Sequence, residues 1–163
     1  MSEIYTHKNV STHESPAASS LAGVRVVIQP DVSVVGWPCG AGSKALEGFI
    51  PLEDATVVPR LRSAGALLTG SSRMSELGFG LAGETAARLL RSEEADVAVI
   101  TDMMGEARVS AAVNRLFGFK PSFGIVSRFG LIGLVPSMEC FGLAAMDPKN
   151  IIDVMTVISG RCL

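Results

Sequence analysis

The sequence predicts an α/β fold in which a central mixed β-sheet is flanked by helices. Short apolar runs, which are typical of buried strands, alternate along the chain with segments of helical periodicity. The composition suits a single core, since 48% of the 163 residues are hydrophobic and only 18% are charged. A chain of this length buries about two thirds of its unfolded surface, so it can fold without disulfides or a structural metal.

The first part of the chain predicts an arm, a strand and a helix. Residues 1–20 are polar and lack apolar periodicity, which predicts a flexible N-terminal arm, whereas residues 21–163 are expected to form one domain. The β-branched run VRVVI at 24–28 predicts a buried strand. A helix is expected over 55–64, with Asp54 as its N-cap.

The middle of the chain continues this alternation. Strands are predicted at 66–70 and 96–102, because both are short apolar runs next to polar or turn residues. Helices are predicted at 81–93 and 106–116, where apolar residues recur at intervals of three and four. Residues 117–123 then return to extended chain.

The C-terminal part predicts one more helix. Residues 124–145 are rich in Gly, Phe and Leu but show no clear period, so no element is predicted there. Asp147-Pro148 begins the helix, because proline is favoured at the first helical position. This helix carries an apolar stripe, which consists of Ile151, Ile152, Met155 and Ile158.

The hydropathy of the chain predicts assembly. Mean hydropathy is +0.40 while the charged fraction is low, so few polar side chains are available to cover a small sphere. We therefore expect a partner chain to cover apolar surface, in a homo-oligomer or as a subunit of a heteromer. The expected interface is the segment 124–145 together with the apolar stripe of the last helix.

Charge and cysteine usage argue against several classes of partner. Fourteen Lys and Arg against 16 Asp and Glu give a net charge of −2, and no basic run is present, so neither nucleic acid nor a membrane surface is expected as a partner. Three cysteines without metal-ligand spacing predict no disulfide framework, metal or cofactor, and they fit a reducing cytoplasm. No stretch is long and apolar enough for a transmembrane helix. A small-molecule ligand remains compatible with the sequence.

The block GFKPSFGIVSRFGLI at 118–132 resembles the amidase signature family, whose members carry GFKPTYGxVSRYGL at the equivalent place. Upstream segments such as GSKALEG, EDATVV and MSEL are similar to family segments in the same order. The resemblance covers about residues 21–142 and is nearest to the A subunits of tRNA-dependent amidotransferases and related amidases. It implies a reduced, truncated form of the amidase core.

The resemblance also implies where a catalytic triad would lie. Amidases of this family use a lysine, relayed through a cis-bonded serine, to activate a nucleophilic serine. The corresponding positions hold Gln29 for the lysine, Ala82 nearest to the relay serine, and Glu106 for the nucleophile. An amide cannot take up the proton as an amine does, and the nucleophilic hydroxyl is absent. We therefore expect no amide hydrolysis by the family mechanism.

Two hypotheses follow from these residues. The first is a non-catalytic pseudoenzyme that acts through self-assembly, as a subunit or as a binding partner. In this case Asp102, Glu106 and Arg108 form a structural ion-pair network at a helix start, and Lys120 is structural as well. The second is a small enzyme that reuses the pocket, with Glu106 or Asp102 as general acid or base in an elimination, isomerisation or cyclisation. A closed concave pocket with Glu106 pointing inward favours the enzyme, whereas a Glu106 that is salt-bridged on the surface favours assembly.

Overall fold

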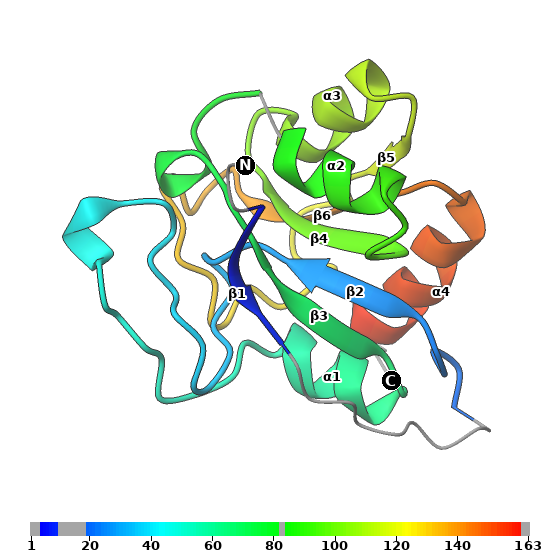
Figure 1. Ribbon diagram of the computed structural model, residues 1–163, viewed down its shortest axis with the longest axis horizontal. Helices are drawn as coiled ribbons and strands as arrows, with labels where there is room; N and C mark the ends of the chain where they lie inside the picture. Colours follow the sequence, from blue (N-terminus) through cyan, green and yellow to red (C-terminus); the bar gives the residue numbers. More distant parts are fainter. Residues whose placement is uncertain (1–3, 10–18, 82–83, 161–163) are drawn as a thin grey trace.

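A six-stranded mixed β-sheet forms the centre of the protein, as the computed structural model shows for residues 4–9, 19–81 and 84–160 (Figure 1). The spatial order is β1-β3-β2-β4-β6-β5. The strands are β1 (Tyr5–Lys8), β2 (Arg25–Ile28), β3 (Leu67–Ser72), β4 (Val97–Asp102), β5 (Phe117–Phe119) and β6 (Cys140–Ala145). Strands β3, β2 and β4 are mutually parallel, whereas β1, β6 and β5 each pair antiparallel with their neighbours. The predicted α/β class is confirmed.

Helices cover both faces of the sheet. They are α1 (Val57–Ser63), α2 (Glu84–Arg91), α3 (Glu106–Val113) and α4 (Pro148–Ile158), with short 3-10 helices η1 (Lys44–Leu46) and η2 (Glu76–Gly78). One buried cluster joins the sheet to α1 and α4, and a second joins the opposite face to α2 and α3 (Figure 1). Side chains of β4 alternate between the clusters, with Val97 and Val99 in the first and Ala98 and Ile100 in the second. No helix in the described ranges is long and apolar enough to cross a membrane.

Strand β6 lies in a segment for which the sequence predicted no element. All six of its residues are buried, and it pairs with β4 along its whole length. Its sequence CFGLAA is poor in the β-branched residues that mark a strand. Gly142 is required because a Cβ there would lie 2.6 Å from Ala107 Cβ of α3. The close approach of α3 therefore selects small residues, and the expectation that 124–145 forms an interface is wrong for this strand.

The N-terminal arm is not flexible throughout. Tyr5–Lys8 forms β1, an antiparallel edge strand next to β3, so the prediction of a flexible arm is wrong for these residues. The ring of His7 lies 4.7 Å from that of Trp37. Residues 1–3 and 10–18 lie outside the described ranges. The strand exists because β3 offers an unpaired edge, which local sequence does not reveal.

The starts of α1 and α4 differ in how well they were predicted. Asp54 is not the N-cap of α1, which begins at Val57; its carboxylate instead accepts a hydrogen bond from the backbone N–H of Val35 at 2.8 Å. By contrast, Asp147 caps α4 as predicted, because its carboxylate accepts the backbone N–H of Lys149 at 2.8 Å.

The apolar stripe of α4 is divided between the core and the surface. Ile151 and Ile158 are 7% and 0% exposed and pack with Val154 against the sheet. Ile158 has no exposed surface to offer a partner chain, so the expectation that it lies at an interface is wrong, whereas Ile151 keeps a small exposed area that lines a surface groove. Ile152 is 64% exposed and Met155 is partly buried. Only this side of the stripe is available for assembly.

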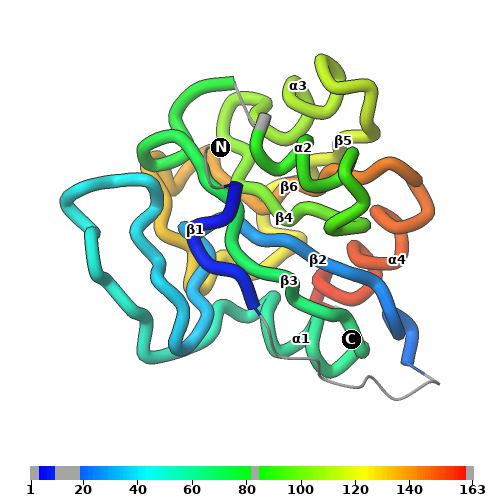
Figure 2. The backbone as a smooth tube through the Cα atoms, in the orientation of Figure 1, coloured from blue at the N-terminus to red at the C-terminus, as the bar shows by residue number. Residues whose placement is uncertain are grey.

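The three parallel strands end side by side, so the connections that follow them lie together at the carboxyl ends of these strands. Gln29 follows β2, Arg73 follows β3, and residues 103–105 follow β4. The carboxyl ends of parallel strands are where α/β sheets present functional groups. The long connection at 29–56 extends from the same edge (Figure 2).

The close approach of two loops predicts the effect of a glycine substitution. Gly130 has a φ of +80°, and a Cβ there would lie 2.4 Å from Ala55 Cα. We expect Gly130→Ala to lower the free energy of unfolding, measured in urea, by about 2 kcal/mol more than Gly124→Ala. Gly124 is the matched control, with a φ of +89° and no atom within 4 Å of its Cβ position. Equal losses would show that only backbone conformation matters.

Candidate functional site

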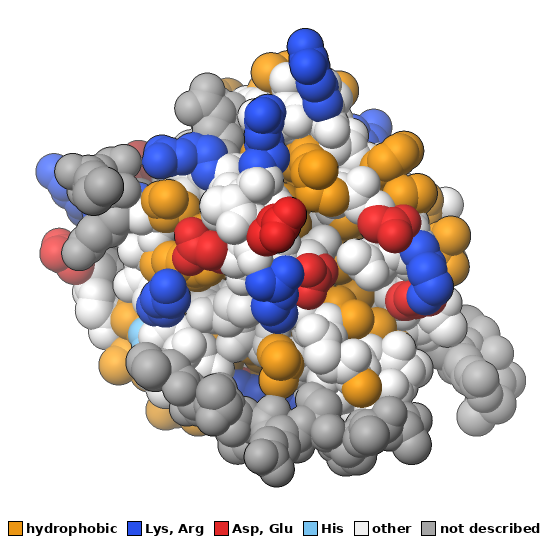
Figure 3. All heavy atoms as spheres, turned by 45° about the vertical axis from the view of Figure 1, so that its right-hand side comes forward, with side chains coloured by type: hydrophobic (Ala, Val, Ile, Leu, Met, Phe, Trp, Pro, Cys, Tyr) orange, Lys and Arg blue, Asp and Glu red, His pale blue; other side chains and the backbone are white. Residues whose placement is uncertain are grey.

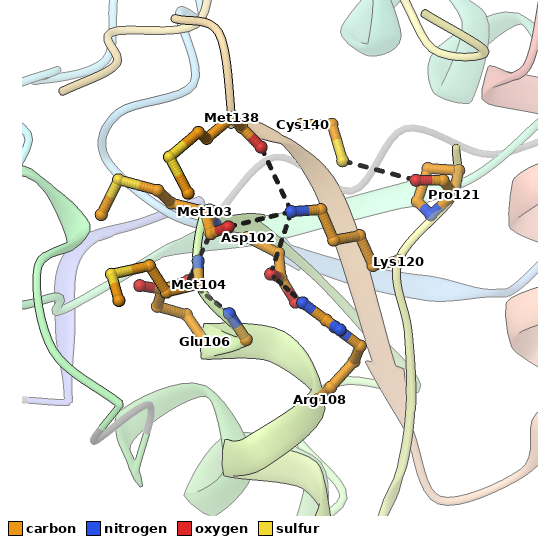
Figure 4. Close-up of polar contacts among 10 residues, drawn as sticks. Asp102, Met103, Met104, Glu106, Arg108, Lys120, Pro121, Met138 and Cys140 are labelled. Atoms are coloured by element: carbon orange, nitrogen blue, oxygen red, sulfur yellow. Dashed lines mark hydrogen bonds and ion pairs between the residues drawn. The ribbon is translucent and has the colours of Figure 1, made fainter. Parts of the chain in front are cut away.

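The turn between β4 and α3 encloses the carboxylate of Glu106. Its Oε2 atom accepts hydrogen bonds from the backbone N–H groups of Met103, Met104 and Gly105, at 2.8, 2.8 and 3.1 Å (Figure 4). Glu106 is the first residue of α3 and is 5% exposed. Backbone N–H groups and the helix N-terminus therefore stabilise this carboxylate.

Asp102 forms a separate, buried ion-pair network. Arg108 binds both of its oxygens, with Nε–Oδ2 at 3.0 Å and Nη2–Oδ1 at 2.9 Å. Lys120 lies 3.5 Å from Oδ1 and also donates to the carbonyls of Met103 and Met138 (Figure 4). Burial alone would raise the pKa of Asp102, but Arg108 and Lys120 outweigh it and hold this pKa below its ordinary value. The predicted ion pairing of Arg108 is thus found with Asp102.

Gln29 bonds the end of β2 to β4. Its side chain is 6% exposed, and Oε1 accepts the backbone N–H of Thr101 at 2.9 Å. The β2–β4 ladder ends at the pair Ile28–Val99, so the Gln29 side chain extends the connection beyond the last paired residues. A lysine ammonium has no acceptor and could not receive this N–H group. At this position glutamine therefore has a structural role that lysine could not fill.

Gln29 and Glu106 line the same cavity, whose volume is about 230 Å³. Arg73, Ser75 and Thr85 also line it. The second oxygen of Glu106 accepts no hydrogen bond from the part of the chain that the structure describes. Of the predicted site residues, the structure therefore brings these two together.

The other predicted site residues lie elsewhere. Asp102 is directed to Arg108 instead of into this cavity, and Ala82 lies outside the described residues. Arg73 also lines the cavity but was not predicted from the sequence. Its position directly after β3 could have indicated it, because β3 ends on the same side of the sheet as β2 and β4.

Two further carboxylates, those of Asp31 and Glu139, are buried outside the lining of this cavity, and the sequence did not predict either as a site residue. Asp31 is 1% exposed and accepts a hydrogen bond from the Thr101 hydroxyl. Burial raises the pKa of Asp31 to about 7; the Thr101 hydroxyl opposes this rise and Glu139 adds to it. Glu139 is also 1% exposed and accepts the N–H of Val135 at 2.8 Å. One oxygen of each carboxylate has no hydrogen-bond partner in the described structure.

The two described cysteines are structural. Cys39 and Cys140 are each 1% exposed. Burial raises the pKa of Cys39 to about 11 and also raises that of Cys140, so neither is poised as a thiolate nucleophile. Within the described ranges, no three His, Cys, Asp or Glu side chains are grouped as a metal site would require.

Comparison with known proteins places these residues in a family context. The sequence profile described as Amidase matches residues 5–90 and 86–163. The A subunit of glutamyl-tRNA(Gln) amidotransferase from Methanosarcina mazei is 34% identical over 91% of this chain and 35% of its own length. That from Haloarcula marismortui is 32% identical over 98% of this chain and 43% of its own. The chain thus spans about two fifths or less of the length of these relatives.

Solved structures show the same relationship. The A subunit of glutamyl-tRNA(Gln) amidotransferase from Thermotoga maritima matches with a TM-score of 0.85 at 22% identity, covering 97% of this chain and 40% of its own. An amidase family protein from Bacillus anthracis matches with a TM-score of 0.81 at 28% identity, covering 89% and 35%. The first likeness shows a shared fold, and the chain here corresponds to part of both proteins.

The hydrogen bonds of Glu106 predict its contribution to stability. We expect Glu106→Ala to lower the free energy of unfolding by about 2 kcal/mol, because three N–H groups lose their acceptor. Glu106→Gln retains a carbonyl oxygen and is expected to cost less than half as much. Urea unfolding monitored by circular dichroism measures both. If Glu106→Ala and Glu106→Gln both left the free energy of unfolding almost unchanged, a capping role for Glu106 would be contradicted.

The buried Asp31 predicts a pH dependence of stability. Its pKa is raised to about 7 in the folded protein, so between about pH 4 and 7 the folded state keeps a proton that the unfolded state releases. Stability relative to Asp31→Asn should therefore fall as the pH rises through this range, by a total on the order of a few kcal/mol. Above about pH 7 the difference should be constant. Parallel stability curves for the two proteins between pH 4 and 8 would contradict this assignment.

Proposed function

The chain belongs to the amidase family, as the block at 118–132 predicts, and we propose that it is a non-catalytic member that acts by binding. It would act through self-assembly, as a subunit or as a binding partner. The main support is the carboxylate of Glu106 at the position that the resemblance assigns to the nucleophile, with its Oε2 held by three backbone N–H groups.

These three N–H groups matter for catalysis as well as for stability. Acyl transfer requires hydrogen-bond donors aimed at the oxygen on which negative charge develops. In the turn 103–105 the donors are bound to Glu106, so they are not available to a substrate oxygen. The residue that replaces the nucleophile therefore also occupies donors that could stabilise such an oxygen.

Apart from the Glu106 carboxylate itself, the described lining of the cavity supplies no side chain that could replace the missing base. Its described lining includes the hydroxyls of Ser75 and Thr85 but no lysine, histidine or cysteine. Gln29 is neutral, and its oxygen is bonded to Thr101. Lys120 is bonded to two backbone carbonyls beside Asp102. Activation of a hydroxyl needs a base within hydrogen-bond reach, and none of these groups meets that requirement.

The surface supports action through assembly. Several large apolar side chains from the second half of the chain expose more than two fifths of their surface, among them Phe117, Phe119, Phe123, Ile125, Phe129 and Ile152. Three of these, Phe119, Ile125 and Ile152, line one groove, and grouped exposure of this kind marks contact sites. On the face shown in Figure 3, acidic and basic side chains are interspersed with hydrophobic ones.

A second candidate function uses Glu106 as a general acid or base. It is favoured by one observation, that Glu106 lines a cavity and has one oxygen without a described hydrogen-bond partner. Asp102, the other acid named for this role, is bound by Arg108 and Lys120. This candidate requires turnover of an added substrate that Glu106→Gln abolishes while the fold is retained.

We predict that the protein does not hydrolyse simple amides and is not labelled by a fluorophosphonate. Glu106→Ser should not restore either property, because it supplies a hydroxyl without a base. Ammonia release from propionamide and gel-based labelling measure the two, with an active serine amidase as positive control. Ser75→Ala is the matched control for the hydroxyl in the cavity. Labelling of the wild type that is coupled to turnover would contradict the proposal.

A further inference from the structure

Strand β5 presents two phenylalanines on the α4 face of the sheet. Phe117 pairs with Ala145 and Phe119 with Leu143, and these partners face the core beneath α1 and α4. Cross-strand partners point to the same face, so both phenylalanines do as well. Gly118 between them faces α3, where a Cβ would lie 2.7 Å from a side-chain atom. The phenylalanines are 52% and 42% exposed because no helix in the described structure covers them.

A groove lies where the sheet extends past α4. Helix α4 packs on β6 and β4, whereas the side chains of Phe117 and Phe119 on the same face of β5 remain about half exposed. The groove, of about 320 Å³, is lined mainly by apolar side chains, namely Phe119, Ile125, Ile151, Ile152 and Met155. We call this the β5–α4 groove. Ile152 is 64% exposed and Ile125 49% exposed, so both project at its margin.

We propose that the β5–α4 groove is the contact surface for a second copy of this chain. The inference rests on the proposed function, in that it assigns the surface through which assembly takes place. The patch combines a hollow with a largely exposed side chain, Ile152, in its lining. In a two-fold dimer each patch meets its own copy, so Ile152 of each protomer can enter the groove of the other.

The charges next to the groove favour a second copy over a strongly charged partner. On α4, Lys149 and Asp153 flank Ile152 and pair with each other, with side chains 74% and 30% exposed. A patch that carries both signs can meet itself across a two-fold axis with opposite charges facing. A uniformly basic partner surface would be repelled by Lys149, and a uniformly acidic one would be repelled by Asp153.

The exposed apolar area is also of a suitable size. Phe117, Phe119, Ile125 and Ile152 together expose roughly 400 Å², taking roughly 200 Å² for a complete large side chain. A standard interface covers about 800 Å² on each partner, of which slightly more than half is apolar. The groove and its margin therefore supply most of the apolar area that such a dimer needs.

Light scattering after gel filtration, from about 1 to 100 µM, tests the inference. The wild type should have twice the 17.0 kDa mass of the chain at the higher concentrations. Ile152→Asp should weaken the dimer by about thirtyfold or more, because it places a charge in an apolar contact. Leu52→Asp is the matched control, since Leu52 is 94% exposed and belongs to the connection between η1 and α1. This connection lies on the left of Figure 1, whereas α4 lies on the right. This control should remain dimeric.

A second variant, Ile125→Asp, changes a groove residue outside α4 and should also give monomers. This result would show that the loss of the dimer in Ile152→Asp does not come from a change confined to α4. Circular dichroism and thermal unfolding verify that all variants are folded. A wild type that is monomeric throughout, or a dimer disrupted by Leu52→Asp but not by Ile152→Asp, would overturn the inference. Amide turnover by the dimer would contradict the proposed lack of catalysis and leave this interface intact. Loss of the interface would leave the catalytic proposal unaffected.

Discussion

Strand β4 is buried on both faces, and this constraint determines how every polar group at its carboxyl end is arranged. A buried polar group without a partner is costly, so each of these residues must find one inside the protein. Thr101 bonds to Gln29 and Asp31, Asp102 to Arg108 and Lys120, and Glu106 to the backbone of its own turn. The separate position of each carboxylate follows from these different partners.

The same constraint explains how the turn before α3 is arranged. A tight turn before a helix directs several N–H groups to one point, and an oxygen atom must lie there to accept their hydrogen bonds. In this chain the oxygen belongs to Glu106. Gln29 likewise supplies an acceptor that lysine lacks. Gln29 and Glu106, which the resemblance places at two positions of the family triad, are therefore both integrated into the hydrogen bonding of the core.

The sequence predicts the elements that rest on local periodicity and misses those that rest on distant partners. Strands β2 and β4 and helix α4 were expected because apolar runs and a capping Asp147 are visible locally. Strands β1 and β6 form because β3 and β4 offer edges, which no local pattern encodes. At the site, the family resemblance indicated Gln29 and Glu106, whereas the burial of Asp31 and Glu139 depends on loops brought together only by the fold.

The β5–α4 groove exists because the sheet has more strands than the two helices on that face can cover. A helix is about 10 Å wide and strands lie about 4.8 Å apart, so two helices cover about four strands on one face. The sheet has six, which leaves an edge on each side exposed. Strand β1 carries exposed Thr6 and Lys8, features that protect an edge from pairing. Strand β5 carries two phenylalanines instead, so water contact there is unfavourable until another surface covers them.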